Sequence, residues 1–307
     1  MKLIGTKNKT KNKIKEKVVV NSNEEFIKSF EELALLLNTD IETLKQECIL
    51  NQLQKLMSKT GNVICSLPVT EEKVKKVFFN AITSKTGEVM ITPAFLDTTK
   101  KIVHKFGLEE QKVNLLIDFP FGESLFKTKL YELMVAKKYG IDSVTVVMPY
   151  KYLVDKQTKL LKKQANKIAK IFGYNTSIAI PANSLSEEDI KLCASSIKKS
   201  KISSITFIFG SISEKEFEQK MSLIKKHFIA LNSVEKDTKI KSIEKQLIDN
   251  KLNKTRKGKQ IRVLASIHNL EGVQALIKTG ADFILTPFAD EISVQLAEKF
   301  NIKGLSI

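Results

Sequence analysis

Three side chains stand where they could take part in proton transfer or nucleophilic chemistry: Asp118, Lys151 and His268. Asp118 interrupts the apolar run LLIDFPF, and burying a carboxylate costs free energy unless the group is paired or used in a reaction. Lys151 follows one apolar strand, and His268 follows another beside Asn269, a suitable place for a general base. Each also has a plainer interpretation: a backbone hydrogen bond for the aspartate, and a solvated loop position for the lysine and the histidine.

A strand, a turn and a helix follow one another in the sequence IDFPFGESLFKTKLYELMVAKKYGIDSVT, residues 117–145. Eight of its residues occupy, without a gap, positions that carry the same residues in one known family: Phe119, Pro120, Gly122, Lys129, Glu132, Ala136, Gly140 and Asp142. A second segment, RVLASIHNLEGVQALIKTGADFILT, matches that family at Ala265, Ser266, Leu270, Glu271, Ala275, Gly280, Ala281 and Asp282. The chain thus resembles the deoxyribose-phosphate aldolase family over residues 62–286.

The resemblance implies a (β/α)8 barrel and an aldol reaction through a Schiff base. In that family a lysine at the end of strand six forms an imine with the carbonyl substrate. A second lysine on strand seven lowers the pKa of the first, and an aspartate on strand four moves protons. An amine is a nucleophile near neutral pH only when it is deprotonated, and burial beside another cation favours that form.

The three family positions hold different side chains in this sequence. Strand four has Thr145, strand seven has Leu264, and strand six has Phe207 or, with the alignment shifted by one residue, Thr206. None of these side chains supplies an amine or a carboxylate. The resemblance therefore implies that no catalytic residue of the family is retained, and the three residues considered first remain as substitutes.

Phosphate binding is also expected to be weaker than in the family. Two residues are missing between Ser266 and Leu270, and with them the paired glycines whose backbone N–H groups approach a phosphate closely. After strand eight a single hydroxyl, that of Thr286, precedes a proline that has no N–H to donate. Gly210 and Ser211 lie before a helix start and keep their donors. We expect these two residues, with Ser266 and Thr286, to hold a phosphorylated small molecule weakly.

Short β-branched runs alternate with amphipathic helices from residue 61 onward, a pattern that predicts a parallel sheet closed into a barrel by crossover helices. The predicted strands are residues 63–67, 88–92, 113–119, 143–148, 176–180, 205–209, 262–266 and 283–286. The helices include residues 214–227 and 290–300. In such a barrel the functional groups lie on the loops after the carboxyl ends of the strands.

Three further segments complete the predicted organisation. Residues 1–20, rich in Lys, Asn and Thr, predict a basic flexible tail, and residues 21–60 predict two or three helices packed on one end of the barrel. Residues 61–307 form the aldolase-like barrel. It contains a lysine-rich insertion at residues 231–260, far longer than the connection to the next strand requires.

The chain of 307 residues has a formal net charge of +17, and nearly all of its basic residues are lysines. Lysine lacks the planar fork with which arginine reads bases and phosphates, so nonspecific contact with polyanions is favoured over specific nucleic-acid recognition. Three widely spaced cysteines, Cys48, Cys65 and Cys193, suit reduced thiols in the cytoplasm. No apolar run approaches the roughly 20 residues that span a bilayer, so no membrane insertion is expected. No ligand cluster predicts a metal or another cofactor.

Three functional hypotheses remain open. In the first, a diverged and catalytically inactive member of the family acts by binding a ligand, a protein partner or a second copy of itself. In the second, an active carbon–carbon lyase or sugar-phosphate enzyme uses a relocated catalytic group. In the third, a basic polyanion-binding protein uses residues 1–20 and 231–260 as its contact surface. A filled, apolar barrel mouth would favour the first hypothesis, and an open polar pocket the second.

Overall fold

The computed structural model describes residues 50–299, apart from residue 52, residues 66–69, residues 199 and 212, residues 234–258, residues 270, 271 and 274, and residues 276–279. The chain divides into two compact units, Met1–Leu53 and Gln54–Ile307. The barrel and its helices lie in the second unit.

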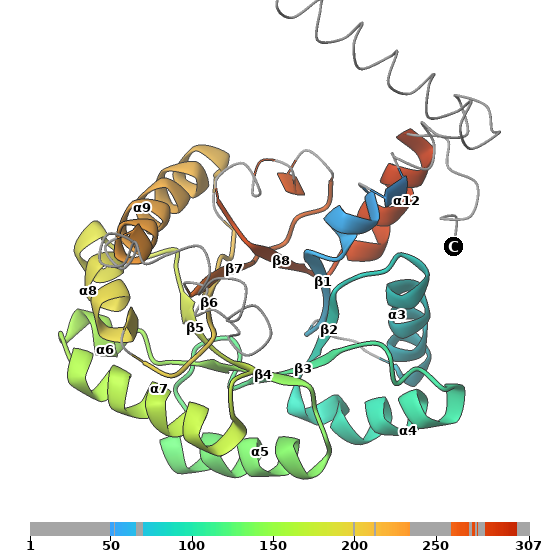
Figure 1. Ribbon diagram of the computed structural model, residues 1–307, viewed down its shortest axis with the longest axis horizontal. Coiled ribbons are helices and arrows are strands. Elements are labelled where there is room, and N and C mark those ends of the chain that lie inside the picture. The colour runs from blue at the N-terminus through green and yellow to red at the C-terminus, as the bar shows by residue number, and fades with distance from the viewer. Residues whose placement is uncertain are drawn as a thin grey trace, which may run out of the picture. The chain divides into compact units, whose positions relative to one another are not determined.

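Eight parallel strands form a closed barrel in which each strand pairs with the next and β8 pairs with β1 (Figure 1). The strands are β1 Thr60–Ile64, β2 Glu88–Ile91, β3 Val113–Ile117, β4 Ser143–Val147, β5 Thr176–Pro181, β6 Ser204–Ile208, β7 Gln260–Leu264 and β8 Phe283–Thr286. A ring of helices surrounds them, as expected when each parallel pair is joined by a helical crossover. The predicted (β/α)8 barrel is confirmed.

The described helices of this ring are α3 Glu71–Thr83, α4 Leu96–Phe106, α5 Phe126–Lys138, α6 Lys151–Val154, α7 Thr158–Phe172, α8 Glu187–Lys198, α9 Glu214–Ser233 and α12 Ala289–Lys299, with a 3-10 turn η1 at Pro93–Phe95. Their ends follow from local chemistry. The Thr70 hydroxyl accepts a hydrogen bond from the Lys73 N–H and caps α3, whose first turn carries Glu71. Gly107 ends α4 with a φ of 64°, a left-handed conformation that glycine adopts without strain.

Several element bounds differ from the sequence prediction, and the largest differences are at β1 and α9. β1 begins at Thr60, where residue 63 was predicted, because Thr60 and Gly61 pair with β8 although neither belongs to an apolar run. The helix predicted to end at residue 227 is α9, which continues to Ser233. Since β7 begins at Gln260, the ends of the predicted insertion belong to regular elements. Residues 234–258, the basic tail and the predicted helices before residue 50 lie outside the described residues.

One buried apolar residue from each strand meets the others inside the barrel. We call this set the upper apolar layer: Val63, Met90, Leu116, Val147, Ala179, Ile208, Leu264 and Leu285. Residues of strands on opposite sides of a closed barrel can pack together only in its interior, and alternate residues of each strand point outward. The outward residues pack on the helices, as Phe207 does against Phe228 of α9 with ring centroids 5.6 Å apart.

Candidate functional site

The family positions on strands four, six and seven lie in the barrel interior. Leu264 belongs to the upper apolar layer. Thr145 and Thr206 each precede a residue of that layer by two positions, so they face the interior one level nearer the amino ends of the strands. Both are fully buried, and the Thr206 hydroxyl lies 3.0 Å from that of Ser177. No amine or carboxylate occupies these three positions.

The structure shows which residue of β6 faces the interior, Thr206 or Phe207, a choice that the sequence left open. Phe207 turns outward to α9, whereas Thr206 shares its face with Ile208 of the upper apolar layer. Thr206 rather than Phe207 is therefore the strand-six residue that faces the interior. The aromatic side chain expected at the nucleophile position contributes to helix packing instead.

The upper apolar layer closes the barrel below its mouth. All eight of its members are buried, and among the described residues Phe119 and Cys65 pack against it. Burial raises the pKa of the Cys65 thiol, so the neutral thiol is favoured there. At this level the interior is a filled apolar core, not an open polar pocket.

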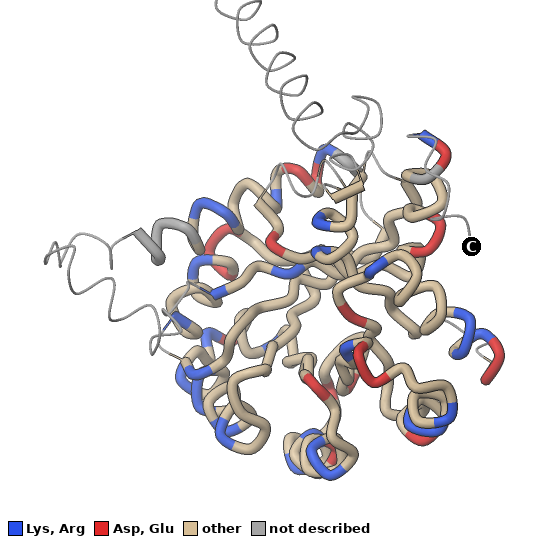
Figure 2. Tube along the Cα trace, turned by 45° about the vertical axis from the view of Figure 1, so that its right-hand side comes forward, with Lys and Arg blue, Asp and Glu red and all other residues tan. Residues whose placement is uncertain are grey.

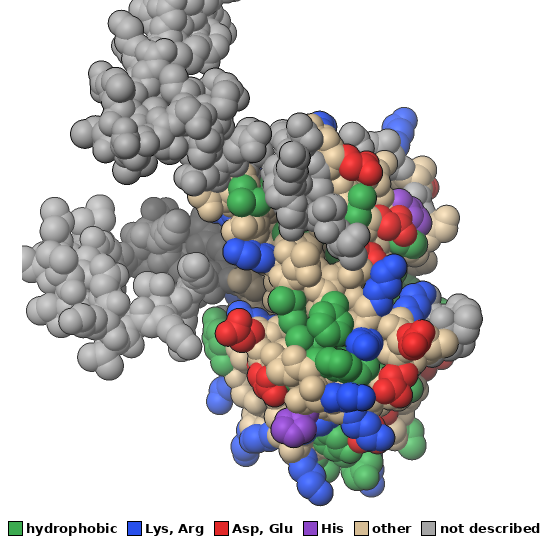
Figure 3. All heavy atoms as spheres, turned by 90° about the vertical axis from the view of Figure 1, so that its right-hand side faces the viewer, with side chains coloured by type: hydrophobic (Ala, Val, Ile, Leu, Met, Phe, Trp, Pro, Cys, Tyr) green, Lys and Arg blue, Asp and Glu red, His purple; other side chains and the backbone are tan. Residues whose placement is uncertain are grey.

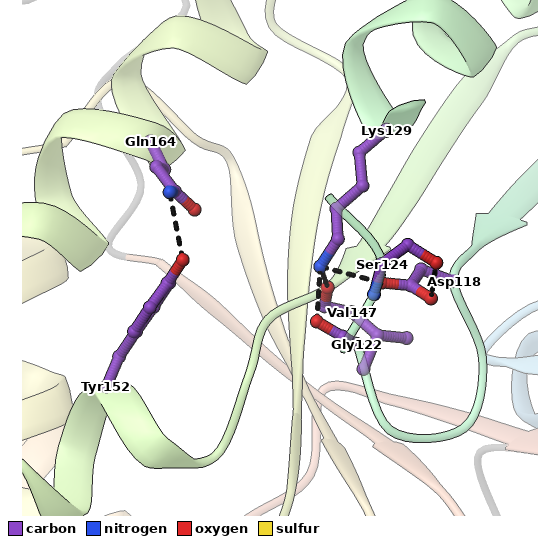
Figure 4. Close-up of polar contacts among 7 residues, drawn as sticks. All are labelled: Asp118, Gly122, Ser124, Lys129, Val147, Tyr152 and Gln164. Carbon is purple, nitrogen blue, oxygen red and sulfur yellow. Dashed lines mark hydrogen bonds and ion pairs between the residues drawn. The ribbon is translucent and has the colours of Figure 1, made fainter. Parts of the chain in front are cut away.

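A buried lysine dominates the loop between β3 and α5 (Figure 4). The side chain of Lys129 is 1% exposed, and its Nζ lies 2.8 Å from Asp118 Oδ2, 2.6 Å from the Gly122 carbonyl oxygen and 2.7 Å from the Val147 carbonyl oxygen. Three acceptors match the three N–H groups of an ammonium. Burial lowers the pKa of Lys129, while the hydrogen bond and charge of Asp118 act to raise it. The lysine thus ties the β3–α5 loop to the end of β4.

Asp118 is the second half of this arrangement. Its carboxylate also accepts hydrogen bonds from the Ser124 N–H at 2.9 Å and the Ser124 hydroxyl at 2.7 Å. The φ of Asp118 is +63°, in the left-handed region that favours glycine, which is the residue that the family usually carries at this position. These contacts of the Asp118 carboxylate, with Lys129 and Ser124, stabilise the loop between β3 and α5. The plainer interpretation of Asp118, a structural hydrogen-bonding group, fits this geometry.

Lys151 and His268 do not join Asp118 in a common site. Lys151 is exposed at the start of α6, which is anchored by a 3.0 Å hydrogen bond from Gln164 to the Tyr152 hydroxyl (Figure 4). His268 is exposed, and its ring lies on that of Phe288 with centroids 3.7 Å apart. The structure therefore leaves the three candidate substitutes in separate environments.

The β6–α9 loop uses its own donors. The Asn183 side chain accepts a 2.9 Å hydrogen bond from the Gly210 N–H and donates one of 3.2 Å to the Ser211 carbonyl oxygen. At the start of α9 the Ser213 N–H and hydroxyl both donate to Glu216, which is the reciprocal cap of a helix start. These bonds lower the pKa of Glu216 below its ordinary value. A phosphate would have to displace an amide and a carboxylate to bind here.

The other two predicted phosphate ligands differ from one another. Thr286 is buried, and its hydroxyl donates to the Ile267 carbonyl oxygen at 2.9 Å, which joins the ends of β7 and β8. Ser266 is exposed and lines a cavity of about 930 Å³ between α3 and α12, together with Asn62, Phe288 and Asp290. In Figure 3, apolar side chains gather on the face of the molecule that carries α3, α4 and α12, with charged side chains around them. The cavity extends from α3 and α12 to the carboxyl ends of β1, β7 and β8.

Charge is distributed over the barrel rather than gathered at a site. Lysines and arginines follow the outer helices, with acidic residues among them (Figure 2). Within the described part of the chain, no cluster of three or more His, Cys, Asp or Glu residues could hold a metal ion. None of the described helices is long and apolar enough to cross a bilayer.

The described strands and helices form a (β/α)8 barrel with a packed interior, and comparison with known proteins shows which barrels it resembles. A deoxyribose-phosphate aldolase of Mycoplasmoides gallisepticum is 30% identical over 86 residues, which are 28% of this chain and 37% of that protein. The tetrameric deoxyribose phosphate aldolase of Aeropyrum pernix superposes with a TM-score of 0.61 at 17% identity, covering 82% of this chain and 97% of the other.

A further solved aldolase superposes with a TM-score of 0.62 at 14% identity, over 80% of this chain and 96% of the other. No family model matches the chain. The protein is similar in fold to these solved aldolases, and over 86 residues it is similar in sequence to one deoxyribose-phosphate aldolase.

The contacts of two residues that hold loops in place could not be predicted from the sequence. Asn183 lies 27 residues before the glycine that it holds, and an asparagine in a loop carries no signal of its partner. Lys129 was recognised as a family residue on a helix, but its burial was not. The sequence shows only that Lys129 lies eleven residues after Asp118, an acidic residue in an apolar run. The fold is needed to show that the two side chains meet.

Proposed function

We propose that the protein is a catalytically inactive relative of the deoxyribose-phosphate aldolases that acts by binding. The observation that carries this proposal is the composition of the interior. Thr206, Leu264 and Thr145 stand where the family has two lysines and an aspartate, and the upper apolar layer fills the space above the two threonines. A Schiff base needs an amine with a free lone pair, which none of these residues offers.

The remaining lysines support the same proposal. Among the described residues Lys129 is the one lysine with a buried side chain, and burial is what makes a lysine nucleophilic near neutral pH. Its three N–H groups already face three oxygen acceptors. This geometry suits a cation that holds a loop, and it leaves no direction from which a carbonyl carbon could be attacked.

Trapping of an imine tests the proposal. The protein is incubated with acetaldehyde or deoxyribose 5-phosphate, reduced with borohydride and weighed by mass spectrometry, with an active deoxyribose-phosphate aldolase as the positive control. The expected result is an unchanged mass for this protein and an adduct on the control. A stoichiometric adduct would overturn the proposal, and its loss in Lys151→Gln would assign the activity to a relocated lysine.

Polyanion binding is a second candidate function, which the charge distribution along the sequence favours. Residues 1–20 carry a net charge of +6 and residues 234–258 one of +4, together ten of the 17 net positive charges. Contacts between lysines and a polyanion should weaken steeply as the salt concentration rises. Binding releases counterions from the polyanion, and added salt makes that release less favourable. Deleting both segments should reduce retention on heparin and leave a cooperatively melting barrel. Unchanged retention would contradict this assignment.

A further inference from the structure

A second level of side chains lies beneath the upper apolar layer. On each of the six strands β2 to β7, the residue two positions before the layer is polar, and two residues apart on a strand means the same face. We call this set the lower polar layer: Glu88, Asn114, Thr145, Ser177, Thr206 and Arg262. All six are more than nine-tenths buried. They line the half of the barrel interior nearer the amino ends of the strands.

Two charged residues of the lower polar layer pair with one another. Arg262 forms an ion pair with Glu88 and lies 4.8 Å from the centroid of the Phe283 ring. Gly61 leaves room for this group, because a Cβ there would approach the Phe283 ring at 2.9 Å and the Glu88 side chain at 3.1 Å. The ion pair is internally neutral. The layer therefore has no net charge that would favour a bound ion of either sign.

The rest of the layer has polar atoms without partners. Both side-chain atoms of the Asn114 amide, the Thr145 hydroxyl and Arg262 Nε have no hydrogen-bond partner among the described residues. Buried polar groups are almost always hydrogen-bonded, because leaving one unpaired costs more free energy than a hydrogen bond contributes. These atoms include donors and an acceptor, so their ligand must both accept and donate.

The registers place two of these groups close together. Asn114 pairs with Ser143, and Thr145 lies two residues further along β4 on the same face. The two side chains are thus diagonal neighbours inside the barrel. Polar groups that face one another beyond direct hydrogen-bonding distance are commonly joined by a water, and a buried water typically makes about three hydrogen bonds.

We propose that the lower polar layer is a binding site for ordered water, with one molecule bridging the Asn114 amide and the Thr145 hydroxyl and another accepting from Arg262 Nε. Water fits because it is neutral, small, and both a donor and an acceptor. The upper apolar layer separates this hydrated level from the barrel mouth. The proposal does not depend on whether the protein is an enzyme.

Apolar substitutions of matched shape should change the urea midpoint in opposite directions at a hydrated and at an unhydrated site. If a water bridges the two groups, Asn114→Leu and Thr145→Val each lower the urea midpoint, and the double variant loses less than the sum of the two. Truly unpaired groups would instead be relieved by apolar replacements, so both midpoints would rise. The control pair is Asn114→Leu with Thr206→Val, which should be additive because the Thr206 hydroxyl already has Ser177 as a partner.

A high-resolution crystal structure of the full chain gives a second, independent readout. The expected result is a density peak within hydrogen-bonding distance of both the Asn114 amide and the Thr145 hydroxyl. It should be absent in the double variant. A direct hydrogen bond between the two side chains, or no density between them, would overturn the proposal.

Discussion

The loop from β3 to α5 and the loop from β6 to α9 follow strands of the same barrel, yet they relate differently to the aldolase family. The first keeps the family residues Phe119, Pro120, Gly122 and Lys129. The second follows β6, whose interior carries Thr206 where the resemblance implies a lysine.

The contacts explain this difference. Next to the β3–α5 loop, the buried Lys129 of α5 donates to three oxygen acceptors, so a change at this residue would disturb the fold itself. In the β6–α9 loop the backbone donors are held by exposed side chains, Asn183 and Glu216. One region is thus held by buried contacts of a single lysine, and the other by hydrogen bonds of exposed side chains. The variants and the titration described next test this difference between the two regions.

Lys129→Met should cause the largest loss of stability. It removes the cation but keeps the length of the side chain, so it leaves the Asp118 carboxylate and two buried carbonyls without their partner. Breaking a buried ion pair from one side costs about 3–5 kcal/mol. Urea unfolding measures the change. Lys127→Met, at an exposed position on the same helix, should stay within about 0.5 kcal/mol of the parent protein.

A double variant separates the ion pair from the packing of the lysine. Asp118→Gly removes the carboxylate and places at φ +63° the residue for which that conformation is free of strain. Combined with Lys129→Met, it should recover part of the loss of the single variant. If the double variant is no more stable than Lys129→Met alone, the uncompensated carboxylate is not the source of the loss.

Gly122→Ala should come next. Gly122 has a φ of +72°, and a Cβ there would lie 2.7 Å from the backbone carbon of Met148. Gly140 has the same φ with nothing within 4 Å, so Gly140→Ala carries the backbone strain alone, about 1–2 kcal/mol. The clash should add about 1–3 kcal/mol more at residue 122. Equal losses in the two variants, measured by thermal and urea unfolding, would show that the loop moves aside without cost.

Asn183→Ala should have a smaller effect. It removes two neutral hydrogen bonds to the β6–α9 loop, each worth about 0.5–1.5 kcal/mol. Amide hydrogen exchange at Gly210 should accelerate by about tenfold for each 1.4 kcal/mol lost locally. Asn166→Ala is the control, since Asn166 accepts a similar bond from the Lys201 N–H elsewhere in the barrel. Acceleration at Gly210 in both variants would mean that the loop responds to general destabilisation.

The smallest effect concerns pH at the start of α9. The pKa of Glu216 is lowered in the folded state by its hydrogen bonds with Ser213, so its contribution to stability is present above the unfolded-state pKa and is lost as the pH falls through the folded-state pKa. NMR titration of the Glu216 side chain should give a midpoint below the ordinary glutamate value. In Ser213→Ala the midpoint should move upward. An unchanged midpoint would contradict the capping assignment.

The strands could be predicted from the sequence because both faces of each strand are buried, which gives short apolar runs separated by helices. The same property prevented a prediction of which residues of a strand face the barrel interior. In SITFIF, apolar residues occupy both faces, so alternation could not decide between Thr206 and Phe207. The start of β1 was missed for a related reason: Thr60 and Gly61 are buried by pairing and packing rather than by apolar character.

The candidate site was less accessible to sequence reasoning than the fold. The apolar neighbours of Asp118 indicated that its carboxylate needed a partner. The sequence did not identify that partner, Lys129, because the contact depends on how α5 packs against the loop. The lower polar layer is made of isolated Thr, Ser and Asn residues on separate strands, which only the strand registers bring to one level. Chemistry that arises from alignment of distant segments leaves no local pattern.

The closed ring of eight strands restricts how any partner can recognise this protein. A sheet with a free edge can accept an extended peptide as an additional strand, with main-chain hydrogen bonds supplying affinity. Here each described strand has a neighbour on both sides, and β8 returns to β1. A partner of the barrel must therefore read side chains on its helices and loops. Recognition through the barrel is expected to depend on residue identity at its surface and to be sensitive to single substitutions there.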